Sequence, residues 1–347
     1  MFKKCKNRIW VAYPQRLFEV NNMAQIFSSI AGNIFGMKEV DSLRLEEMEW
    51  PKRLAKSFPG PKYGIKGIRK MSGIKDRPLS GTIIKPKLGL TATQHSKVAY
   101  KAWKGGLDIV KDDENLTSQS FNKFKSRMQK TIKLKKKAEK ETGEKKFYLA
   151  NVSAETFKML ERTKVVNELK NEHIMVDILT VGFSGVQTLR DRSFSLALHG
   201  HRAMHAAITR KKDHGISMKA IASASRLIGI DQLHIGTGVG KMEGGIKEVQ
   251  EIQQELIKPL YGLKKVFPVC SGGLNPGHIP SLIKAYGKDI IVQAGGGVHG
   301  NPLGTKAGAK AMRQAIDATM NGKSLKEKAK QNKELAAAIK KWGVYDV

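Results

Sequence analysis

The sequence predicts an α/β protein in which a closed (β/α)8 barrel follows an α+β N-terminal domain. Two observations lead to this fold class. From about residue 81 onward, short apolar or β-branched runs alternate with longer amphipathic stretches, which is the pattern of repeated βα units. Eight such runs follow one another without a long insertion, and eight successive βα units close into a barrel.

The eight runs are interpreted, in chain order, as strands of four to six residues. They comprise residues 81–84, 107–110, 147–152, 174–179, 194–198, 232–235, 266–270 and 289–293. The catalytic residues of such barrels lie in the loops at the carboxyl ends of the strands. Residues capable of chemistry stand at the ends of six of the eight predicted strands, so we expect them to share one face of the barrel.

Length and composition limit the class of protein. With 347 residues, 40% of them hydrophobic, the chain is long enough for one large domain and a smaller one. No apolar run approaches the roughly 20 residues that span a bilayer, and the N-terminus lacks the apolar core of a signal peptide. We therefore predict a cytoplasmic protein without a membrane partner. The two cysteines, Cys5 and Cys270, suggest no disulfide framework.

The formal net charge of +31 is the strongest compositional outlier, and a nucleic-acid partner is its obvious interpretation. The lysines concentrate in predicted helices and turns, such as 134–146 and 323–334, where acidic residues are interspersed. No zinc-finger, RNA-recognition or helix-turn-helix signature organises them. We therefore expect no nucleic-acid partner. A positive field can instead steer a multiply phosphorylated small substrate toward its site.

The segment Lys111-Asp112-Asp113-Glu114 places one lysine beside three carboxylates at the end of an apolar run. An isolated segment of this kind can be a solvated turn. Here the preceding strand carries its end into a cleft, where Asp113 and Glu114 can offer the oxygen ligands that Mg²⁺ prefers. A desolvated lysine with a lowered pKa can lose its proton and add CO2, and the resulting carbamate is an oxygen ligand. The segment therefore suggests a magnesium site that includes a carbamylated Lys111.

Further polar clusters stand at the ends of the other predicted strands. They are Lys85-Pro86-Lys87, His199-Gly200-His201-Arg202, His234 with the loop 236–241, Ser271-Gly272-Gly273 and Gly295-Gly296-Gly297. Taken singly, such histidines are often structural and such glycines often serve turns. After the last two strands, however, glycines can present backbone N–H groups to a phosphate. With a second anion site from Arg202, His234 and Ser271, two phosphate sites would flank the metal, which implies a bisphosphorylated sugar.

These residues resemble the large subunit of ribulose-1,5-bisphosphate carboxylase/oxygenase. The matching segments are GTIIKPKLGL (81–90), GGLDIVKDDEN (105–115), HGHRAMHAA (199–207), HIGTGVGKMEGG (234–245), PVCSGG (268–273) and QAGGG (293–297). They stand in the family's order and span most of the chain. The segments ANVSAET (150–156) and HGHRAMHAA are similar to those of the archaeal forms. Residues 13–37 are similar to the end of the family's N-terminal domain.

The resemblance implies a reaction and its cofactors. Ribulose 1,5-bisphosphate would be carboxylated through an enediolate to two molecules of 3-phosphoglycerate, with O2 as the competing substrate of a side reaction. Lys111, carbamylated by activating CO2, would hold Mg²⁺ together with Asp113 and Glu114.

The resemblance also implies roles for other residues. Lys85 and His201 would move protons, and Lys241 would stabilise the incoming carboxylate. Asn33 would reach the substrate from the partner subunit, because the family's sites form across a dimer. The residues implied to bind substrate are Asn33, Lys87, Arg202, His234, Ser271, Gly272, Gly273, Gly295 and Gly296.

The resemblance divides the chain into residues 1–60, a remnant of the family's α+β N-terminal domain, and residues 61–347, its (β/α)8 barrel. The family's N-terminal domain begins far upstream of Met1, and its earlier part carries a glutamate and a Thr-Trp pair that complete the neighbour's site. We expect the sheet of this truncated domain to be short of strands and to expose an edge. Ile83 stands where some members have a substrate-contacting threonine, although isoleucine is a familiar variant.

Three functions are compatible with these features. The first is a magnesium-dependent carboxylase that forms a homodimer or an assembly of dimers. It would serve nucleotide salvage, as the sequence similarity to archaeal forms suggests. The second is a carboxylase-like enolase or isomerase that does not fix CO2, although the retention of Lys85, His201 and Lys241 argues against it. The third is an incomplete, non-catalytic basic protein.

Overall fold

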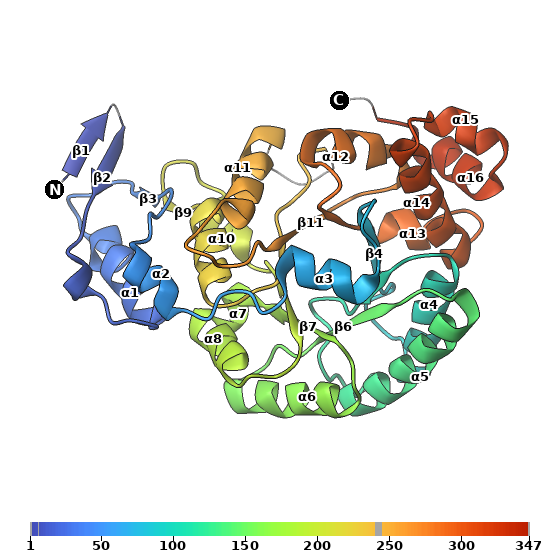
Figure 1. Ribbon diagram of the computed structural model, residues 1–347, viewed down its shortest axis with the longest axis horizontal. Coiled ribbons are helices and arrows are strands. Elements are labelled where there is room, and N and C mark those ends of the chain that lie inside the picture. Colours follow the sequence, from blue (N-terminus) through green and yellow to red (C-terminus); the bar gives the residue numbers. More distant parts are fainter. Residues whose placement is uncertain (1, 6, 240–244, 346–347) are drawn as a thin grey trace.

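A computed structural model describes residues 2–5, 7–239 and 245–345 of the chain. A ring of helices surrounds a closed barrel of eight parallel strands, and the first elements of the chain lie to one side of this ring (Figure 1). The predicted fold class, an α/β protein with a (β/α)8 barrel and an N-terminal domain, is confirmed.

Each of the eight predicted strands has a counterpart in the barrel. Their bounds are β4 Leu79–Ile83, β5 Ile109–Lys111, β6 Phe147–Asn151, β7 His173–Asp177, β8 Ala197–His201, β10 Gln232–His234, β11 Phe267–Ser271 and β12 Ile291–Gln293. Around the barrel they follow the order β10-β11-β12-β4-β5-β6-β7-β8, and β8 closes on β10. Closure pairs both edges of every strand, so the backbone hydrogen bonds of the sheet are made within the barrel.

Helices cover the outside of the barrel (Figure 1). Their bounds are α4 Ala92–Lys104, α5 Phe124–Thr142, α6 Thr156–Glu168, α7 Ile178–Val181, α8 Phe183–Asp191, α9 His205–Thr209, α10 Met218–Leu227, α11 Ile246–Ile257, η3 Pro276–His278, α12 Ile279–Tyr286, α13 Gly296–His299, α14 Thr305–Met320, α15 Leu325–Lys330 and α16 Lys333–Trp342. Among the helices of the described ranges, none is both long and apolar enough to cross a membrane.

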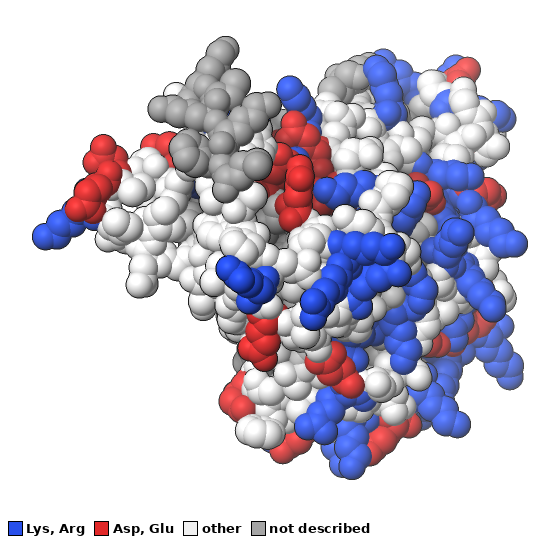
Figure 2. All heavy atoms as spheres, turned by 60° about the vertical axis from the view of Figure 1, so that its left-hand side comes forward, with Lys and Arg blue, Asp and Glu red and all other residues white. Residues whose placement is uncertain are grey.

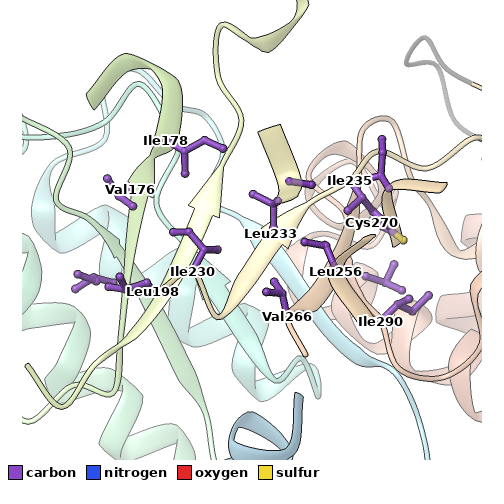
Figure 3. Close-up of a cluster of buried hydrophobic side chains, with 14 of the residues drawn as sticks. Val176, Ile178, Leu198, Ile230, Leu233, Ile235, Leu256, Val266, Cys270 and Ile290 are labelled. Atoms are coloured by element: carbon purple, nitrogen blue, oxygen red, sulfur yellow. The ribbon is translucent and has the colours of Figure 1, made fainter. Parts of the chain in front are cut away.

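Alternation along the strands separates two apolar clusters. Val176, Leu198 and Leu233 point outward and pack with side chains such as Leu256 of α11 between the strands and the helices (Figure 3). The side chains in the alternate positions, among them Met175, form a second buried cluster inside the barrel. The two-residue period of a strand therefore assigns each side chain to the outer core or to the barrel interior.

Helix α3 (Gly64–Ser72) closes the amino-terminal end of the barrel. Ile65 and Ile68 of this helix belong to the inner cluster. The buried carboxylate of Asp231 accepts hydrogen bonds from the backbone N–H groups at the start of α3 and pairs with Arg190 at 2.6 Å. These polar partners fix α3 in place, because a buried carboxylate is stable only when it is hydrogen-bonded or paired.

The N-terminal region lies beside the barrel. Its elements are β1 Phe2–Cys5, β2 Arg8–Val11, η1 Gln15–Leu17, α1 Met23–Ile30, η2 Asn33–Gly36, β3 Arg44–Leu45 and α2 Lys52–Ser57. β1 and β2 form a two-stranded antiparallel sheet, and β3 pairs with β9 (Gly215–Ile216). Phe27 of α1 stacks on Phe183 of α8 with ring centroids 4.7 Å apart. Contacts with β9 and α8 thus attach the region to one side of the barrel.

Most strand ends differ from the prediction by one to three residues, and two of these differences concern predicted site residues. We expected the fifth strand to end at residue 198, but β8 continues through His199 and His201. Gly200 permits tight packing on the outer face, since a Cβ there would lie only 3.0 Å from Cδ1 of Leu233. Lys111 likewise belongs to β5 and does not follow it. Polar residues weaken the sequence pattern of a strand, whereas the folded barrel gives each of them a partner.

The positive charge is unevenly distributed and partly neutralised by acidic side chains (Figure 2). Figure 2 shows basic side chains gathered over one side of the molecule, with acidic side chains among them. Glu172, for example, pairs with both Lys135 at 2.6 Å and Lys145 at 2.5 Å. The expectation of no nucleic-acid partner stays a prediction.

His173, which contacts Phe147 of the inner cluster, makes the stability of the fold depend on pH. It is fully buried at the start of β7, its ring centroid lies 4.5 Å from that of Phe147, and its ring nitrogens lack hydrogen-bond partners among the described residues. Burial lowers the pKa of His173 from 6.5 to about 3. The folded chain therefore keeps this ring neutral in a pH range where the unfolded chain takes up a proton.

We expect the free energy of unfolding to fall as the pH drops below about 6.5, with His173 contributing roughly 1.4 kcal/mol per pH unit until the pH approaches 3. His173→Leu removes no hydrogen bond, so it should preserve stability at pH 7 and reduce this pH dependence. Urea unfolding of both chains between pH 7 and pH 4 measures the difference. The same pH dependence in both chains would contradict the assignment.

Candidate active site

The carboxyl ends of the strands gather most of the predicted site residues at the end of the barrel opposite α3. The residues that end their strands are Lys111 of β5, His201 of β8, His234 of β10 and Ser271 of β11. Because all eight strands are parallel, these ends meet at one mouth. The prediction that the polar clusters share one face of the barrel is therefore confirmed for these residues.

Lys111 is buried at the centre of this mouth. Its Nζ lies 2.9 Å from the carbonyl oxygen of Asp112, 3.4 Å from Oε2 of Glu114 and 3.4 Å from Sδ of Met175. Burial lowers the pKa of Lys111, and the nearby carboxylates, of which Glu114 acts most strongly, oppose this shift only in part. The amine therefore loses its proton more readily than that of an exposed lysine.

Asp113 and Glu114 begin the loop after β5. Asp113 is buried, and its Oδ2 accepts a hydrogen bond from Nζ of Lys85 at 2.6 Å. Burial alone would raise the pKa of Asp113, but the bond from Lys85 helps to lower it. Burial is likewise outweighed at Glu114, whose pKa is lowered by the charges of Lys111 and His201. Both carboxylates are thus ionised near neutral pH and able to bind a cation.

The donor set fits Mg²⁺ on one condition. In residues 2–5, 7–239 and 245–345, no group of three histidine, cysteine, aspartate or glutamate side chains is placed to hold a metal ion. Asp113 and Glu114 supply two carboxylates, and Nζ of Lys111 lies 3.4 Å from Oε2 of Glu114. A carbamate on Lys111 would add the third oxygen ligand. These three residues are the ones that would hold the ion.

His201 faces the carboxylates from the opposite wall. Its Nδ1 lies 3.0 Å from Oδ1 of Asp177, the last residue of β7, and 3.1 Å from the backbone nitrogen of Ala203. Its Nε2 lies 3.7 Å from Oε2 of Glu114. Asp177 thus orients the ring so that Nε2 is directed toward the cluster, which is the arrangement needed for proton transfer at this position.

A chain of hydrogen bonds connects the barrel interior with Ser271. Nδ1 of His199 lies 2.8 Å from Oε1 of Gln232, and Nε2 of His199 lies 2.8 Å from Nε2 of His234. Nδ1 of His234 lies 2.6 Å from Oγ of Ser271. Burial holds the pKa of His199 and that of His234 well below 6.5. Both rings are therefore neutral, and each donates through one nitrogen and accepts through the other.

Arg202 follows β8 and lies against the glycine-rich loop after β10. Its Nη1 donates to the carbonyl oxygen of Ile235 at 3.2 Å, and burial lowers the pKa of Arg202 to about 10. Gly236 has a φ of +97°, and a Cβ there would lie 2.8 Å from Nη2 of Arg202. Glycine thus gives the guanidinium room at the mouth, where its donors suit an anion.

The predicted phosphate-binding glycines lie in two neighbouring turns. Gly272 and Gly273 follow β11, with φ values of +120° and +71°. Gly295 and Gly296 follow β12, which pairs with β11. A Cβ on Gly295 would lie 3.6 Å from Cε of Lys85, so this turn also adjoins the lysine that pairs with Asp113. The turns are close enough to the mouth to contribute backbone donors.

Three predicted residues are not part of this described cluster. Lys87 is exposed, two residues beyond Lys85. Asn33 is exposed at the start of η2, in the N-terminal region. Lys241 lies outside the described residues. The roles that the resemblance implies for them stay predictions.

Polar residues on the third and fourth strands, Asn151 and Asp177, were not predicted as site residues. Nδ2 of Asn151, the last residue of β6, donates to the carbonyl oxygen of Glu114 at 2.8 Å, and Asp177 orients His201. Each was treated as part of an apolar run. The available signal was the position of a polar residue near the carboxyl end of such a run, where barrels place their chemistry.

The barrel and its polar mouth define a (β/α)8-barrel enzyme. Comparison with protein families extends this assignment. The model described as ribulose bisphosphate carboxylase large chain, catalytic domain, matches residues 64–342, and the model of that chain's N-terminal domain matches residues 2–54. The chain belongs to the ribulose bisphosphate carboxylase large chain family.

Individual relatives agree with this assignment. The chain is 50% identical over 348 aligned residues to the ribulose bisphosphate carboxylase of Methanocaldococcus jannaschii, and the match covers 96% of this chain and 82% of that protein. A sulfate complex of the octameric enzyme from Pyrococcus horikoshii superposes with a TM-score of 0.93 at 45% identity, covering 96% and 80% of the two chains. For the dimeric enzyme from Hyperthermus butylicus the TM-score is 0.92 at 45% identity, with coverage of 99% and 85%.

The hydrogen-bond chain predicts the tautomers of its two histidines. The amide oxygen of Gln232 can only accept, so His199 should carry its proton on Nδ1 and accept on Nε2. His234 should then carry its proton on Nε2 and accept from the hydroxyl of Ser271. Nitrogen-15 chemical shifts of the labelled imidazoles at pH 6 measure both states, and Ser271→Ala should leave the His199 tautomer unchanged. A cationic ring or the reverse tautomer order would contradict the geometry.

Proposed function

We propose that the chain is a magnesium-dependent ribulose-bisphosphate carboxylase. It would convert ribulose 1,5-bisphosphate, CO2 and water into two molecules of 3-phosphoglycerate, with an oxygenase side reaction. The observation that carries the proposal is the buried Lys111, whose Nζ lies 3.4 Å from Oε2 of Glu114 at the end of β5, next to Asp113. The desolvated amine favours carbamylation, and the two ionised carboxylates beside it favour cation binding.

The lysine chemistry follows from its surroundings. Addition of CO2 to the neutral amine of Lys111 forms an N–C bond, and the proton released leaves a carbamate with one negative charge. Burial disfavours the charged ammonium form of Lys111 and so favours the neutral amine, which is the form that reacts with CO2. Bound Mg²⁺ would then stabilise the negative charge and polarise the C2 carbonyl and C3 hydroxyl of the substrate.

A different side chain would carry out each proton transfer of the reaction. The carbamate of Lys111 would accept the C3 proton and give the enediolate, whose C2 attacks CO2. His201, held by Asp177 with Nε2 toward the cluster, would assist proton movement when water adds at C3. After the C2–C3 bond breaks, Lys85 would protonate the carbanion, supported by Lys87.

Two groups of residues would hold the ends of the substrate. Arg202, His234 and Ser271 would bind one phosphate, and backbone N–H groups of the turns after β11 and β12 would bind the other. The second set comprises Gly272, Gly273, Gly295 and Gly296. We further propose that Lys241, in the loop after β10, stabilises the carboxylate that forms at C2.

We propose a homodimer or an assembly of dimers as the working form. The enzyme from H. butylicus is dimeric and that from P. horikoshii is octameric. In this chain, the N-terminal region exposes the large apolar side chains Ile9, Val11, Ile34 and Met37, which is typical of a surface that another chain covers. In such a dimer, Asn33 would serve the site of the partner subunit.

Carboxylation is favoured over an enolase or isomerase that does not fix CO2. Lys85 and His201 are both present at the mouth, Lys85 at 2.6 Å from Asp113. An enzyme that stops at the enediolate needs no group to protonate the carbanion formed by C–C cleavage. Service in nucleotide salvage is part of the same proposal and rests on the resemblance to archaeal forms.

The decisive assay measures incorporation of labelled CO2 into 3-phosphoglycerate by the purified chain with ribulose bisphosphate, Mg²⁺ and bicarbonate. We expect Lys111→Ala to lower the rate by a factor of 10³ or more, because the variant lacks both the base and a metal ligand. Lys146→Ala is the matched control, since Lys146 is equally buried but pairs with Glu144, outside the mouth, at 2.6 Å.

The two variants separate the proposal from a general effect of losing a buried lysine. Activity retained by Lys146→Ala but not by Lys111→Ala supports the carboxylase. Labelled product at an equal rate from Lys111→Ala would refute the role of the carbamate. A folded parent chain that forms no product would favour the enolase or the non-catalytic alternative.

A further inference from the structure

Asp112 is the one carboxylate of the Lys111–Glu114 segment that has no role in the proposed chemistry. It lies between Lys111 and Asp113, and the alternation of an extended chain turns its side chain away from the mouth. There it is fully buried against α4, α5 and β6. A buried carboxylate in this position needs a physical explanation.

Four residues from three elements bond the Asp112 carboxylate. Oδ2 accepts from Nη2 of Arg127 at 3.1 Å and from the backbone N–H of Asn151 at 3.0 Å. Oδ1 accepts from the hydroxyl of Tyr148 and lies 3.2 Å from Nε2 of His95. The side chain is thus held from α4, α5 and β6 at once, which fixes the rotation of its peptide about the strand axis.

The same partners also hold the loop after β5. Arg127 donates to the carbonyl oxygens of Thr117 at 2.7 Å and Asn122 at 2.9 Å. Asn151, whose backbone bonds Asp112, donates through its side chain to the carbonyl oxygen of Glu114 at 2.8 Å. One buried network therefore restrains the strand end, the backbone of Glu114 and the start of the following loop.

We propose that Asp112 is a positioning residue for the cation site. By fixing its own peptide it sets the direction in which Lys111 and Asp113 project from the opposite face of the chain. Loss of its charge leaves the guanidinium of Arg127 without its buried partner and lets the strand end rotate, so the three oxygen ligands no longer point at one ion. The inference rests on the proposed magnesium site.

Asp108 provides a matched control at the other end of β5. It is also fully buried and pairs with Arg77 at 2.7 and 2.8 Å and with the backbone N–H of Ser80 at 2.8 Å. It lies just before β5, at the end of the barrel away from the mouth. Asp108→Asn therefore removes a comparable buried ion pair without touching the network around Asp112.

The test compares Asp112→Asn and Asp108→Asn in the full chain. Mn²⁺ serves as the spectroscopic probe of the Mg²⁺ site, and its affinity is measured by electron paramagnetic resonance with bicarbonate present. Retention of labelled activating CO2 and the unfolding temperature are measured in parallel. We expect both variants to unfold at lower temperature, but only Asp112→Asn to weaken Mn²⁺ binding, by tenfold or more, with a matching loss of retained CO2.

Tyr148→Phe gives a milder test if Asp112→Asn does not fold. It removes one hydrogen bond to Asp112 and keeps the aromatic ring that packs edge-on against Trp103. We expect it to weaken Mn²⁺ binding severalfold. Unchanged Mn²⁺ affinity in the folded variants of this network would overturn the inference, as would an equal loss in Asp108→Asn. A parent chain that binds no Mn²⁺ would instead remove the proposed metal site, and the inference with it.

Discussion

The two-residue alternation of strands in a closed barrel is the constraint on which the rest of the structure depends. A strand such as β5 must place Val110 in the outer core while Ile109 and Lys111 enter the barrel. A shift of one residue would exchange these environments, burying Lys111 among helices and moving Val110 into the mouth. The hydrophobic pattern that specifies the fold therefore also determines which side chains can take part in chemistry.

Carboxylates are buried at both ends of the barrel, and three of them are paired with arginines. Asp108 pairs with Arg77 and Asp231 with Arg190, and Asp112 pairs with Arg127. Removal of one partner from such a pair typically costs about 3–5 kcal/mol, because the other charge stays buried. The histidines of the interior are compensated differently, since burial lowers their pKa values and leaves them neutral. Stability and site geometry thus depend on the same polar groups.

The sequence pattern was sufficient to predict the barrel, because eight successive apolar runs leave few alternative folds. It also identified Lys111, His201 and Ser271 through their places at strand ends. The pattern did not predict that Asp177 and Asn151 belong to the site, because their hydrogen-bond partners His201 and Glu114 lie 24 and 37 positions away in the chain. Strand ends were misplaced where polar side chains continue a strand into the mouth, since their partners come from other strands and only the folded barrel brings them together.

The pair of Lys85 and Asp113 illustrates how burial decides which group can move. Their 2.6 Å contact joins a carboxylate with a 1% exposed side chain to a lysine with a 40% exposed one. Asp113 is further restrained by the backbone N–H of Asn115 at 3.1 Å. If Asp113 binds a cation, Lys85 is the partner that leaves, because water can solvate its ammonium group at little cost. The exchange would free Lys85 beside Gly295, on the side of the mouth where the substrate is proposed to bind, while the carboxylate keeps its position.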